Sequence, residues 1–514
     1  MARIRYLGHA GFVVEHGEHR LLMDPWFHSA FLQSWFPYPD NAALLPSVLE
    51  GRYDHLWISH FHEDHFDVEV IRRLDKDITV LLADFRSKAL PKSFAEMGFE
   101  NVVTLAHKES LELAPGLTAT MYLDTSHKED SALLVDLDGY RFLDLNDCNT
   151  PMSELPGDVD LLAAQFSGAM WYPNCYDYPP AVMQEKVDGV RGDLLDTLRR
   201  KIQLTGASTY LPSAGPACFL DPDLAIYNDR DTTIFPSWEQ VADDVKDASP
   251  GVEVVRLGPG DTVIVDAEKR AITTERSPDG HLDEDLDAYR ERRRDEWEVY
   301  HAGPEPEITQ AELDEYFHTL QHRNKRFLGD FTKDIRLVAG SADWDIRLGK
   351  LAQDLVIESE EPFDPDYTLL VPPRALRAIL DGTCGWEEAL LSMRCGLHRD
   401  PDVFDLTFMG LLRYGSHPVQ TMQMLRERQN DETIERDGLR LQRFCPHAGE
   451  DLTYADIAGG RIECPRHHWI WDARTGACID KASIPLRVEV LDEESPVLIR
   501  GTAASPPTSG SGSA

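Results

Sequence analysis

Residues 53–67, YDHLWISHFHEDHFD, concentrate side chains that bind metal ions. His60, His62, Asp64 and His65 fall within six residues. Because two sets of nitrogen and oxygen ligands are available in so short a span, the cluster suits a site that holds two metal ions. The alternative interpretation is a solvated polar loop, which the density of ligand-type residues disfavours.

A second group of potential ligands lies in residues 444–472, FCPHAGEDLTYADIAGGRIECPRHHWIWD. A Cys-x-His pair and a Cys-x-x-His pair are separated here by sixteen residues. Two thiolates on one iron and two imidazoles on the other are the ligands of a Rieske [2Fe-2S] cluster. A Cys₂His₂ zinc site uses the same donors, but zinc fingers group the cysteines apart from the histidines. The spacing therefore predicts an iron–sulfur cluster bound by Cys445, His447, Cys464 and His467.

The elements around the first motif indicate how its ligands would be positioned. From residue 1 to about 265, short β-branched and aromatic runs alternate with helical patterns such as 185–203, which is typical of an α/β or α+β domain. The apolar run HLWIS before the histidines predicts a buried strand. If the chain stays extended beyond it, alternation puts His60, His62 and Asp64 on one side, and His65 turns back as a helix begins.

Changes in composition and in the strand and helix patterns along the chain predict several domains, as expected for 514 residues. Residues 372–382, PPRALRAILDG, have proline at a helix start and glycine past its end. From about residue 430, short strands and glycine turns return. We expect a metal domain over 1–265, a charged connector and small α/β module over 266–429, a Rieske domain over 430–503 and a disordered tail over 504–514.

Composition limits the possible partners. A formal net charge of −39 disfavours nucleic acid and anionic membranes, which bind through clusters of Lys and Arg. The chain has neither a signal-peptide pattern nor an apolar run long enough to span a bilayer. Eight scattered cysteines indicate a reducing compartment and metal chemistry, not a disulfide framework. We therefore expect a cytoplasmic protein.

The motif His60-x-His62-x-Asp64-His65 after an apolar strand resembles the metallo-β-lactamase superfamily. Residues 7–27 are similar to the opening hairpin of that αββα sandwich, and residues 124–149 to its later metal motifs. The resemblance implies that His127 is the third histidine and that Asp147 bridges the metals.

One departure from this family concerns its final histidine. Residues 209–222, TYLPSAGPACFLDP, contain none, so the second metal position would lack a ligand, and one or two metals remain possible. The resemblance also implies that the turn containing His9 lies near the metals. There His9 could contact substrate or only pack.

The Cys–His loops resemble those of Rieske ferredoxins and oxygenases, because they lack the extra cysteines of respiratory Rieske proteins. Zinc has no accessible redox step, so an electron-carrying cluster would be useless beside zinc. We therefore predict iron in the first site, as one or two non-haem ions, in place of zinc.

The two motifs together, with residues 166–179, 212–222 and 397–406, are similar to CMP-N-acetylneuraminate hydroxylases and their bacterial relatives over most of the chain. In those enzymes, however, the Rieske domain is N-terminal. The resemblance implies a Rieske-fed oxygenase, of hydroxylase or N-oxygenase type. Its substrate would be a small polar molecule such as a nucleotide sugar or natural-product intermediate. One alternative is a metal-dependent lactone or phosphoester hydrolase with a redox-sensing cluster, and another is an electron-transfer module with a degenerate metal site.

Electrons should come from another protein. The chain lacks the Gly-x-Gly-x-x-Gly turn that binds a dinucleotide, so we expect a ferredoxin or an NAD(P)H-dependent reductase as donor. We also expect His447 and His467 at a surface where the iron site or the donor docks. The negative charge would steer a donor with a basic face.

Overall fold

The computed structural model describes residues 2–278, 280–328, 331–349, 356–357, 363–428, 431–447, 449–466, 468–479 and 484–491. His467 and the expected tail at 504–514 lie outside these residues. In the described part of the chain, no helix is long and apolar enough to cross a membrane.

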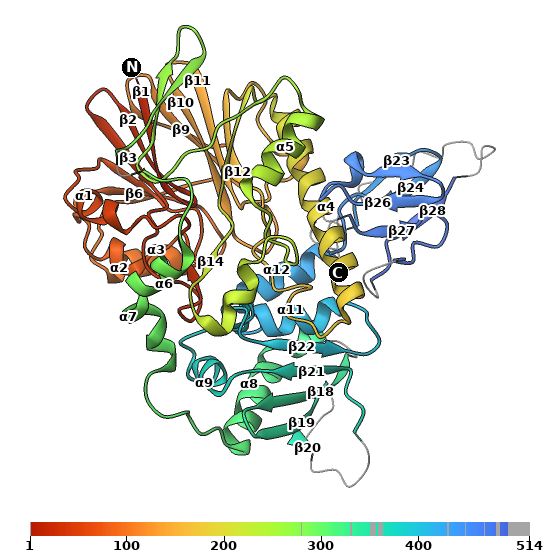
Figure 1. Cartoon of the computed structure of the whole chain (residues 1–514). Coiled ribbons are helices and arrows are strands. Elements are labelled where there is room, and N and C mark those ends of the chain that lie inside the picture. The colour runs from red at the N-terminus through yellow and green to blue at the C-terminus, as the bar shows by residue number, and fades with distance from the viewer. Residues whose placement is uncertain are drawn as a thin grey trace, which may run out of the picture.

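Two sheets packed face to face form the first domain (Figure 1). The eight-stranded sheet has the order β17 (Ala271–Glu275), β16 (Thr262–Asp266), β1 (Ala2–Gly8), β2 (Gly11–His16), β3 (His19–Met23), β5 (His55–Trp57), β6 (Thr79–Ala83) and β7 (Val102–Leu105). The seven-stranded sheet has the order β15 (Glu253–Val254), β13 (Thr209–Ser213), β12 (Leu161–Gln165), β11 (Tyr140–Asn146), β10 (Ser131–Leu137), β9 (Leu117–Leu123) and β8 (Ser110–Ala114). Because β17 pairs with β16, the first sheet continues past residue 265.

The core of this sandwich follows from alternation along the strands, which sends apolar side chains inward from both sheets. Phe12 and Phe142 meet edge to face, with ring centroids 5.3 Å apart. Helices cover the outer faces: α1 (Leu45–Leu49), α2 (Val68–Ile71) and α3 (Ala89–Glu96) on one side, and α4 (Pro180–Thr205) and α5 (Trp238–Ala248) on the other.

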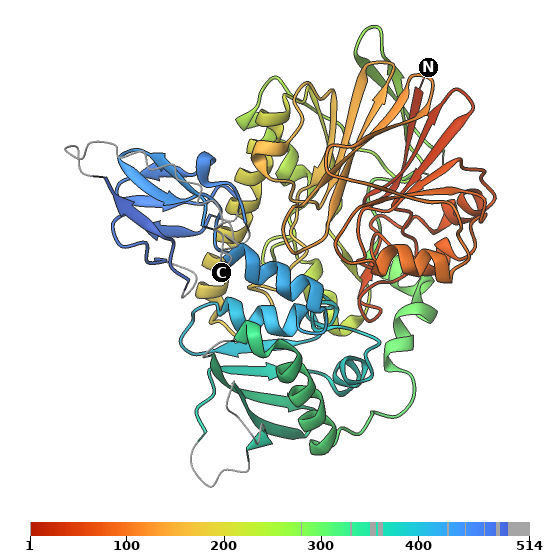
Figure 2. The ribbon, with the colours of Figure 1, turned by 180° about the vertical axis from the view of Figure 1, so that it is seen from behind.

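The charged connector contains α6 (Leu286–Arg292) and α7 (Arg294–Trp297). It is anchored to the first domain by Tyr289, a fully buried residue whose hydroxyl donates to the Pro37 carbonyl at 2.7 Å. The connector therefore runs along the first domain, which is visible both from the front and from behind (Figures 1 and 2).

The middle module is a five-stranded sheet covered by helices. Its strand order is β20 (Val356–Ile357), β19 (Ala342–Gly349), β18 (Thr332–Ala339), β21 (Tyr367–Leu370) and β22 (Gly396–Arg399). Its helices are α8 (Gln310–Leu328), α9 (Pro373–Asp381), α10 (Trp386–Leu391), α11 (Leu406–Tyr414) and α12 (Pro418–Arg428). The helix predicted over 372–382 is confirmed as α9, which ends at Gly382 in the left-handed region, with φ of 71°.

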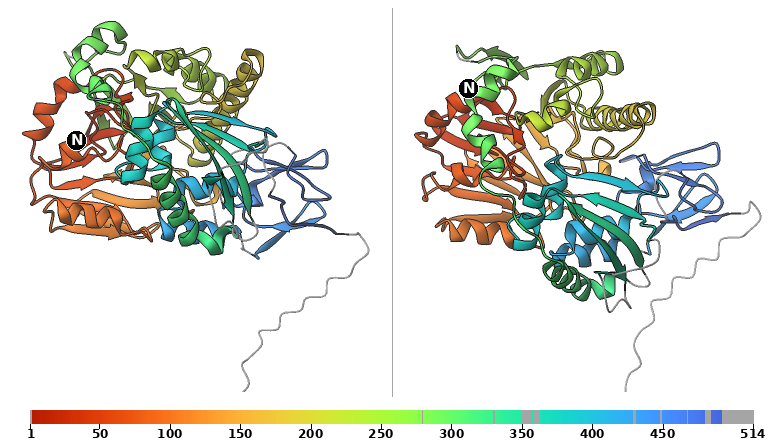
Figure 3. Two further views of the ribbon diagram at one scale, coloured as in Figure 1. Left: turned by 90° about the horizontal axis from the view of Figure 1, so that it is seen from below. Right: turned by 60° about the horizontal axis from the view of Figure 1, so that its bottom comes forward.

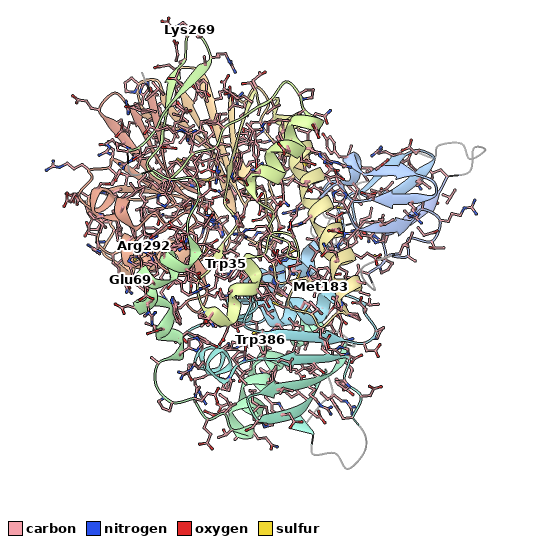
Figure 4. All side chains as sticks on the ribbon, viewed as in Figure 1. Trp35, Glu69, Met183, Lys269, Arg292 and Trp386 are labelled. Carbon is pink, nitrogen blue, oxygen red and sulfur yellow. The ribbon has the colours of Figure 1, made fainter. Side chains whose placement is uncertain are left out.

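The module packs against the first domain through a continuous apolar core. The Trp35 indole N–H donates to the Leu391 carbonyl at 2.8 Å. Trp35 and Trp386, both labelled in Figure 4, lie near this junction, whereas Lys269 lies at the far tip of the sandwich.

The C-terminal domain consists of two three-stranded sheets, β23 (Thr433–Arg436), β24 (Leu439–Gln442) and β28 (Val488–Val490), and β25 (Asp456–Ala458), β26 (Arg461–Glu463) and β27 (Ile470–Asp472). The expected glycine turns are present, because Gly449, Gly459, Gly460 and Gly476 all have positive φ. This domain lies beside α4 (Figures 1 and 3).

Candidate metal centre

The histidine cluster lies on a tight turn between β5 and α2. The backbone N–H groups of His65 and Phe66 both donate to the His62 carbonyl, at 3.0 and 2.8 Å. The prediction that the chain stays extended through the motif is therefore wrong, because β5 already ends at Trp57. The turn, and not alternation along a strand, brings the ligands together. Asp67 then caps α2 by accepting from the Val70 N–H at 3.1 Å.

Two groups of possible metal ligands share His65. One comprises His9, Asp64 and His65, the other His60, His65 and Asp147, and the ligand atoms within each group lie within 4.8 Å of one another. In the first set, His9 Nε2 lies 3.1 Å from Asp64 Oδ2. In the second set, His65 Nε2 lies 3.5 Å from Asp147 Oδ1.

Buried polar groups behind the cluster fix its rings. His65 Nδ1 lies 2.8 Å from Asp24 Oδ2, so the carboxylate holds the proton on Nδ1 and leaves Nε2 available as a ligand. Asp24 is itself held by the Ser59 N–H and hydroxyl. Asp130 takes the same position behind His60, with Oδ1 3.2 Å from Nδ1. No local sequence pattern indicates these orienting roles, because Asp24 and Asp130 lie far from the motif along the chain.

The electrostatics favour a cation in this site. Burial alone would lower the pKa of His60, but the Asp130 and Asp147 carboxylates raise it to about 9. The pKa of His65 is also raised, because Asp147 and Asp64 outweigh burial. The buried carboxylates therefore require positive charge, which the histidines supply as protons and which metal ions would supply when bound.

Buried polar atoms without a hydrogen bond also indicate that a metal ion fits this site. Among the described residues, His9 Nε2, His65 Nε2 and Asp147 Oδ1 are buried and make no hydrogen bond of good geometry. Leaving such atoms unsatisfied is costly, and metal coordination would satisfy them. The donor set of imidazoles and carboxylates suits iron, manganese or zinc.

Two other predicted ligands lie at the edge of these groups. His62 Nδ1 is 2.9 Å from His60 Nε2. His127 is buried and its ring centroid lies 4.8 Å from that of Tyr414 on α11, but it belongs to neither group of ligand atoms. Asp147 follows Asn146, whose left-handed φ of 40° ends β11 and whose side chain accepts from the Asp147 N–H.

Three of the four predicted Rieske ligands, Cys445, His447 and Cys464, converge in the C-terminal domain, with possible ligand atoms within 4.8 Å of one another. His467 falls outside the described residues. The expectation that His447 lies at a surface is wrong, since it is only 9% exposed and its ring stacks on Trp469 at 4.3 Å. His468, beside the motif, lies 2.6 Å from Glu463 and packs.

The cluster loops contact the first domain through buried polar groups. Arg466, next to the expected ligand position, forms an ion pair with Asp124, and both side chains are almost fully buried. The Arg466 carbonyl accepts from the Thr197 hydroxyl on α4 at 3.1 Å. From the other loop, Glu450 accepts from the Met152 N–H at 3.1 Å.

Asp124 links the Arg466 contact to the segment that contains the candidate metal ligand His127. Its Oδ1 accepts from the Ser126 N–H at 2.9 Å, directly before His127. Its own N–H donates to the carbonyl of Asp130, the residue behind His60, at 2.8 Å. The segment 124–130 therefore contacts the cluster loop and supports the histidine site.

A cavity of about 490 Å³ lies elsewhere, between the first domain and the middle module, lined by residues that include Tyr300, Arg374 and Arg394. Asp221, Asp223 and His301 gather near it. However, one Asp221 oxygen already accepts from both Arg394 and His301, at 2.6 and 2.8 Å. This group is therefore an ion-pair network and not a second metal centre.

Comparisons with known proteins agree with this two-site arrangement. Residues 3–172 match the beta-lactamase superfamily domain, and residues 429–489 match the Rieske [2Fe-2S] domain. The chain therefore combines a metallo-β-lactamase-fold domain with a C-terminal Rieske domain, and a Rieske domain implies a [2Fe-2S] cluster. A protein of Mycolicibacterium smegmatis named for a Rieske 2Fe-2S iron–sulfur cluster is 26% identical, over 95% of this chain and all of its own.

The cytidine monophosphate-N-acetylneuraminic acid hydroxylase of Danio rerio is 27% identical, over 41% of this chain and 38% of its own. This similarity is less extensive than the sequence motifs suggested. Among solved structures, CmlA, a diiron beta-hydroxylase from Streptomyces venezuelae, aligns over 54% of each chain at 20% identity, with a TM-score of 0.35.

Proposed function

We propose that this chain is a Rieske-fed non-haem iron oxygenase that inserts oxygen from O₂ into a small polar substrate. The observation that carries the proposal is the buried contact between Arg466 of the cluster loop and Asp124 of the segment that contains His127. A hydrolase with a merely structural cluster would not need its cluster loop fixed against the metal site.

The residues that would hold iron are His60, His62, Asp64, His65, His127 and Asp147. Iron held by imidazoles and carboxylates supplies dioxygen activation, which the [2Fe-2S] cluster supports with electrons. Zinc would bind the same donors but could not accept an electron.

The chain's own residues prepare this chemistry. Asp24 holds a proton on Nδ1 of His65, and Asp130 holds one on Nδ1 of His60. The opposite nitrogen of each ring, Nε2, is therefore left available to a metal ion. The Gln165 amide donates to the Asp147 carbonyl at 2.9 Å and fixes that turn. Tyr414 packs against His127 and, because it is only 4% exposed, keeps water from that side.

The substrate class is taken from a relative. That relative is, by its name, a hydroxylase of cytidine monophosphate-N-acetylneuraminic acid. We extend to this chain the class of small polar molecules, with nucleotide sugars and natural-product intermediates as the first candidates.

Isotope incorporation tests the reaction class. The purified protein, reduced chemically and mixed with polar metabolite fractions, is exposed to ¹⁸O-labelled dioxygen and analysed by mass spectrometry. We expect a product that has gained one labelled oxygen atom, and its loss in Cys445→Ser, which cannot assemble the cluster. Label from water, with undiminished turnover in Cys445→Ser, would identify a hydrolase instead.

A further inference from the structure

The seven-stranded sheet lacks a metal ligand at the end of β13. The strand ends at Ser213, followed by Ala214, and neither side chain is a metal-binding imidazole or carboxylate. Asp64 and His65 would then hold a second metal with only the help of Asp147. We infer that His9, from the turn between β1 and β2, supplies the missing ligand. This inference rests on the proposed metal centre but not on the oxygenase reaction.

The backbone ties the His9 turn to the end of β13. The His9 carbonyl accepts from the Ala214 N–H at 2.9 Å and from the Tyr6 hydroxyl at 3.2 Å. His9 itself has φ of 53°, a left-handed conformation that is uncommon for a residue other than glycine. The turn therefore holds His9 beside the strand end that carries no ligand.

The side chain points to the metal ligands. His9 is 5% exposed, and its Nε2, which makes no hydrogen bond of good geometry among the described residues, lies 3.1 Å from Asp64 Oδ2. The same Asp64 oxygen lies 3.7 Å from His65 Nε2. Trp26 packs edge to face on the His9 ring, with centroids 4.8 Å apart, and so restrains its orientation. Three ligand atoms thus converge from two separate turns.

The arrangement divides the ligands between two positions. His9, Asp64 and His65 form one, and His60, with His65 and Asp147, forms the other. Asp147 Oδ1 lies 3.5 Å from His65 Nε2, the nitrogen that faces both groups. With His9 as a ligand, the residues present would offer donors for two metal ions.

The main alternative is that His9 only donates a hydrogen bond to Asp64. The variant His9→Gln distinguishes the two roles, because an amide can donate to Asp64 but binds Fe²⁺ and Co²⁺ more weakly than an imidazole does. His16→Ala is the matched control, since His16 at the end of β2 makes a comparable 2.8 Å contact with Asp138 of the β10–β11 turn, and neither belongs to a ligand group.

The test measures metal binding, not activity. Full-length protein with its cluster intact is stripped of other metals and titrated anaerobically with Fe²⁺, and in parallel with Co²⁺, whose absorption reports coordination. We expect two equivalents per chain in the wild type and in His16→Ala. We expect one in His9→Gln and His9→Ala, with the second equivalent weakened by more than the roughly 10–100-fold that loss of an outer partner costs.

Two results would overturn the inference: a second equivalent that binds His9→Gln as tightly as wild type, or a wild type that binds only one. Unchanged Rieske absorption and thermal unfolding would show that the variants are folded. If the wild type binds two metals and His9→Gln one, but no oxygen is incorporated, the proposed function fails and the His9 assignment stands.

Discussion

At the scale of single residues, the residues of the candidate metal site, ligands and orienting groups alike, divide into those that the sequence could reveal and those that it could not. His60, His62, Asp64 and His65 are visible because one turn contains them all. Asp24, Asp130 and the role of His9 come from distant segments, which only the sheet brings next to the motif. Their sequence signal is weak, because a single Asp or His at a strand end is more often structural.

Asp24→Asn should weaken metal binding without removing a ligand. The amide cannot hold the His65 proton as a carboxylate does, so we expect affinity to fall by roughly 10- to 100-fold. Competition with a chelator at fixed pH measures this, with Asp138→Asn at the surface as control. Equal affinity for Asp24→Asn and wild type would remove Asp24 from the site.

At the scale of elements, the sequence predicted local features better than their assembly. The capped helix at 372–382 and the glycine turns of the C-terminal domain are present, because local backbone preferences determine them. Leu376 and Ile379 of this helix are buried in the core. The burial of His447 was missed, since it depends on tertiary packing that no local pattern records.

Asp402 joins α4 to the middle module and should give the structure an acid-sensitive contact. It accepts from Tyr178, Lys186 and Arg399 at 2.6 to 2.7 Å. Although burial opposes this, these partners lower its pKa to about 2. Because the folded pKa lies below the unfolded value of about 3.9, the stabilisation is present above pH 4 and is lost as pH falls toward 2.

Asp402→Asn should therefore lower the free energy of unfolding at neutral pH. The decrease should be modest, because the carboxylate is partly exposed. The difference from wild type should shrink toward pH 2, as followed by urea unfolding monitored by circular dichroism. A difference that stays constant from pH 6 to pH 2 would contradict this role.

The Arg466–Asp124 pair should hold the Rieske domain in place. Because both side chains are buried, Asp124→Asn removes the largest counter-charge of the Arg466 guanidinium and should destabilise the contact, by up to about 3 to 5 kcal/mol. We expect faster proteolysis between the domains while the cluster spectrum stays intact. The double variant Arg466→Met with Asp124→Leu should recover part of the loss. Equal protease resistance in Asp124→Asn and wild type would exclude this function.

At the scale of the whole molecule, the formal net charge of −39 should govern the encounter with the proposed electron donor. A donor with a basic face should be steered toward this surface, and salt should slow delivery as the screening length falls from about 10 Å at 0.1 M toward 3 Å at 1 M. Stopped-flow reduction of the cluster measures the rate. A rate independent of salt would contradict steering, and direct reduction by NADH alone would remove the need for a donor protein.

The central claim is that the metallo-β-lactamase-fold domain holds a redox-active metal served by the Rieske cluster. Elemental analysis of anaerobically purified protein tests it most directly, with Cys445→Ser included to subtract the iron of the cluster. Iron in excess of the cluster's two atoms, retained in Cys445→Ser and reduced in His62→Ala, is the predicted result. Zinc in the first domain, with no iron beyond the cluster, would contradict it.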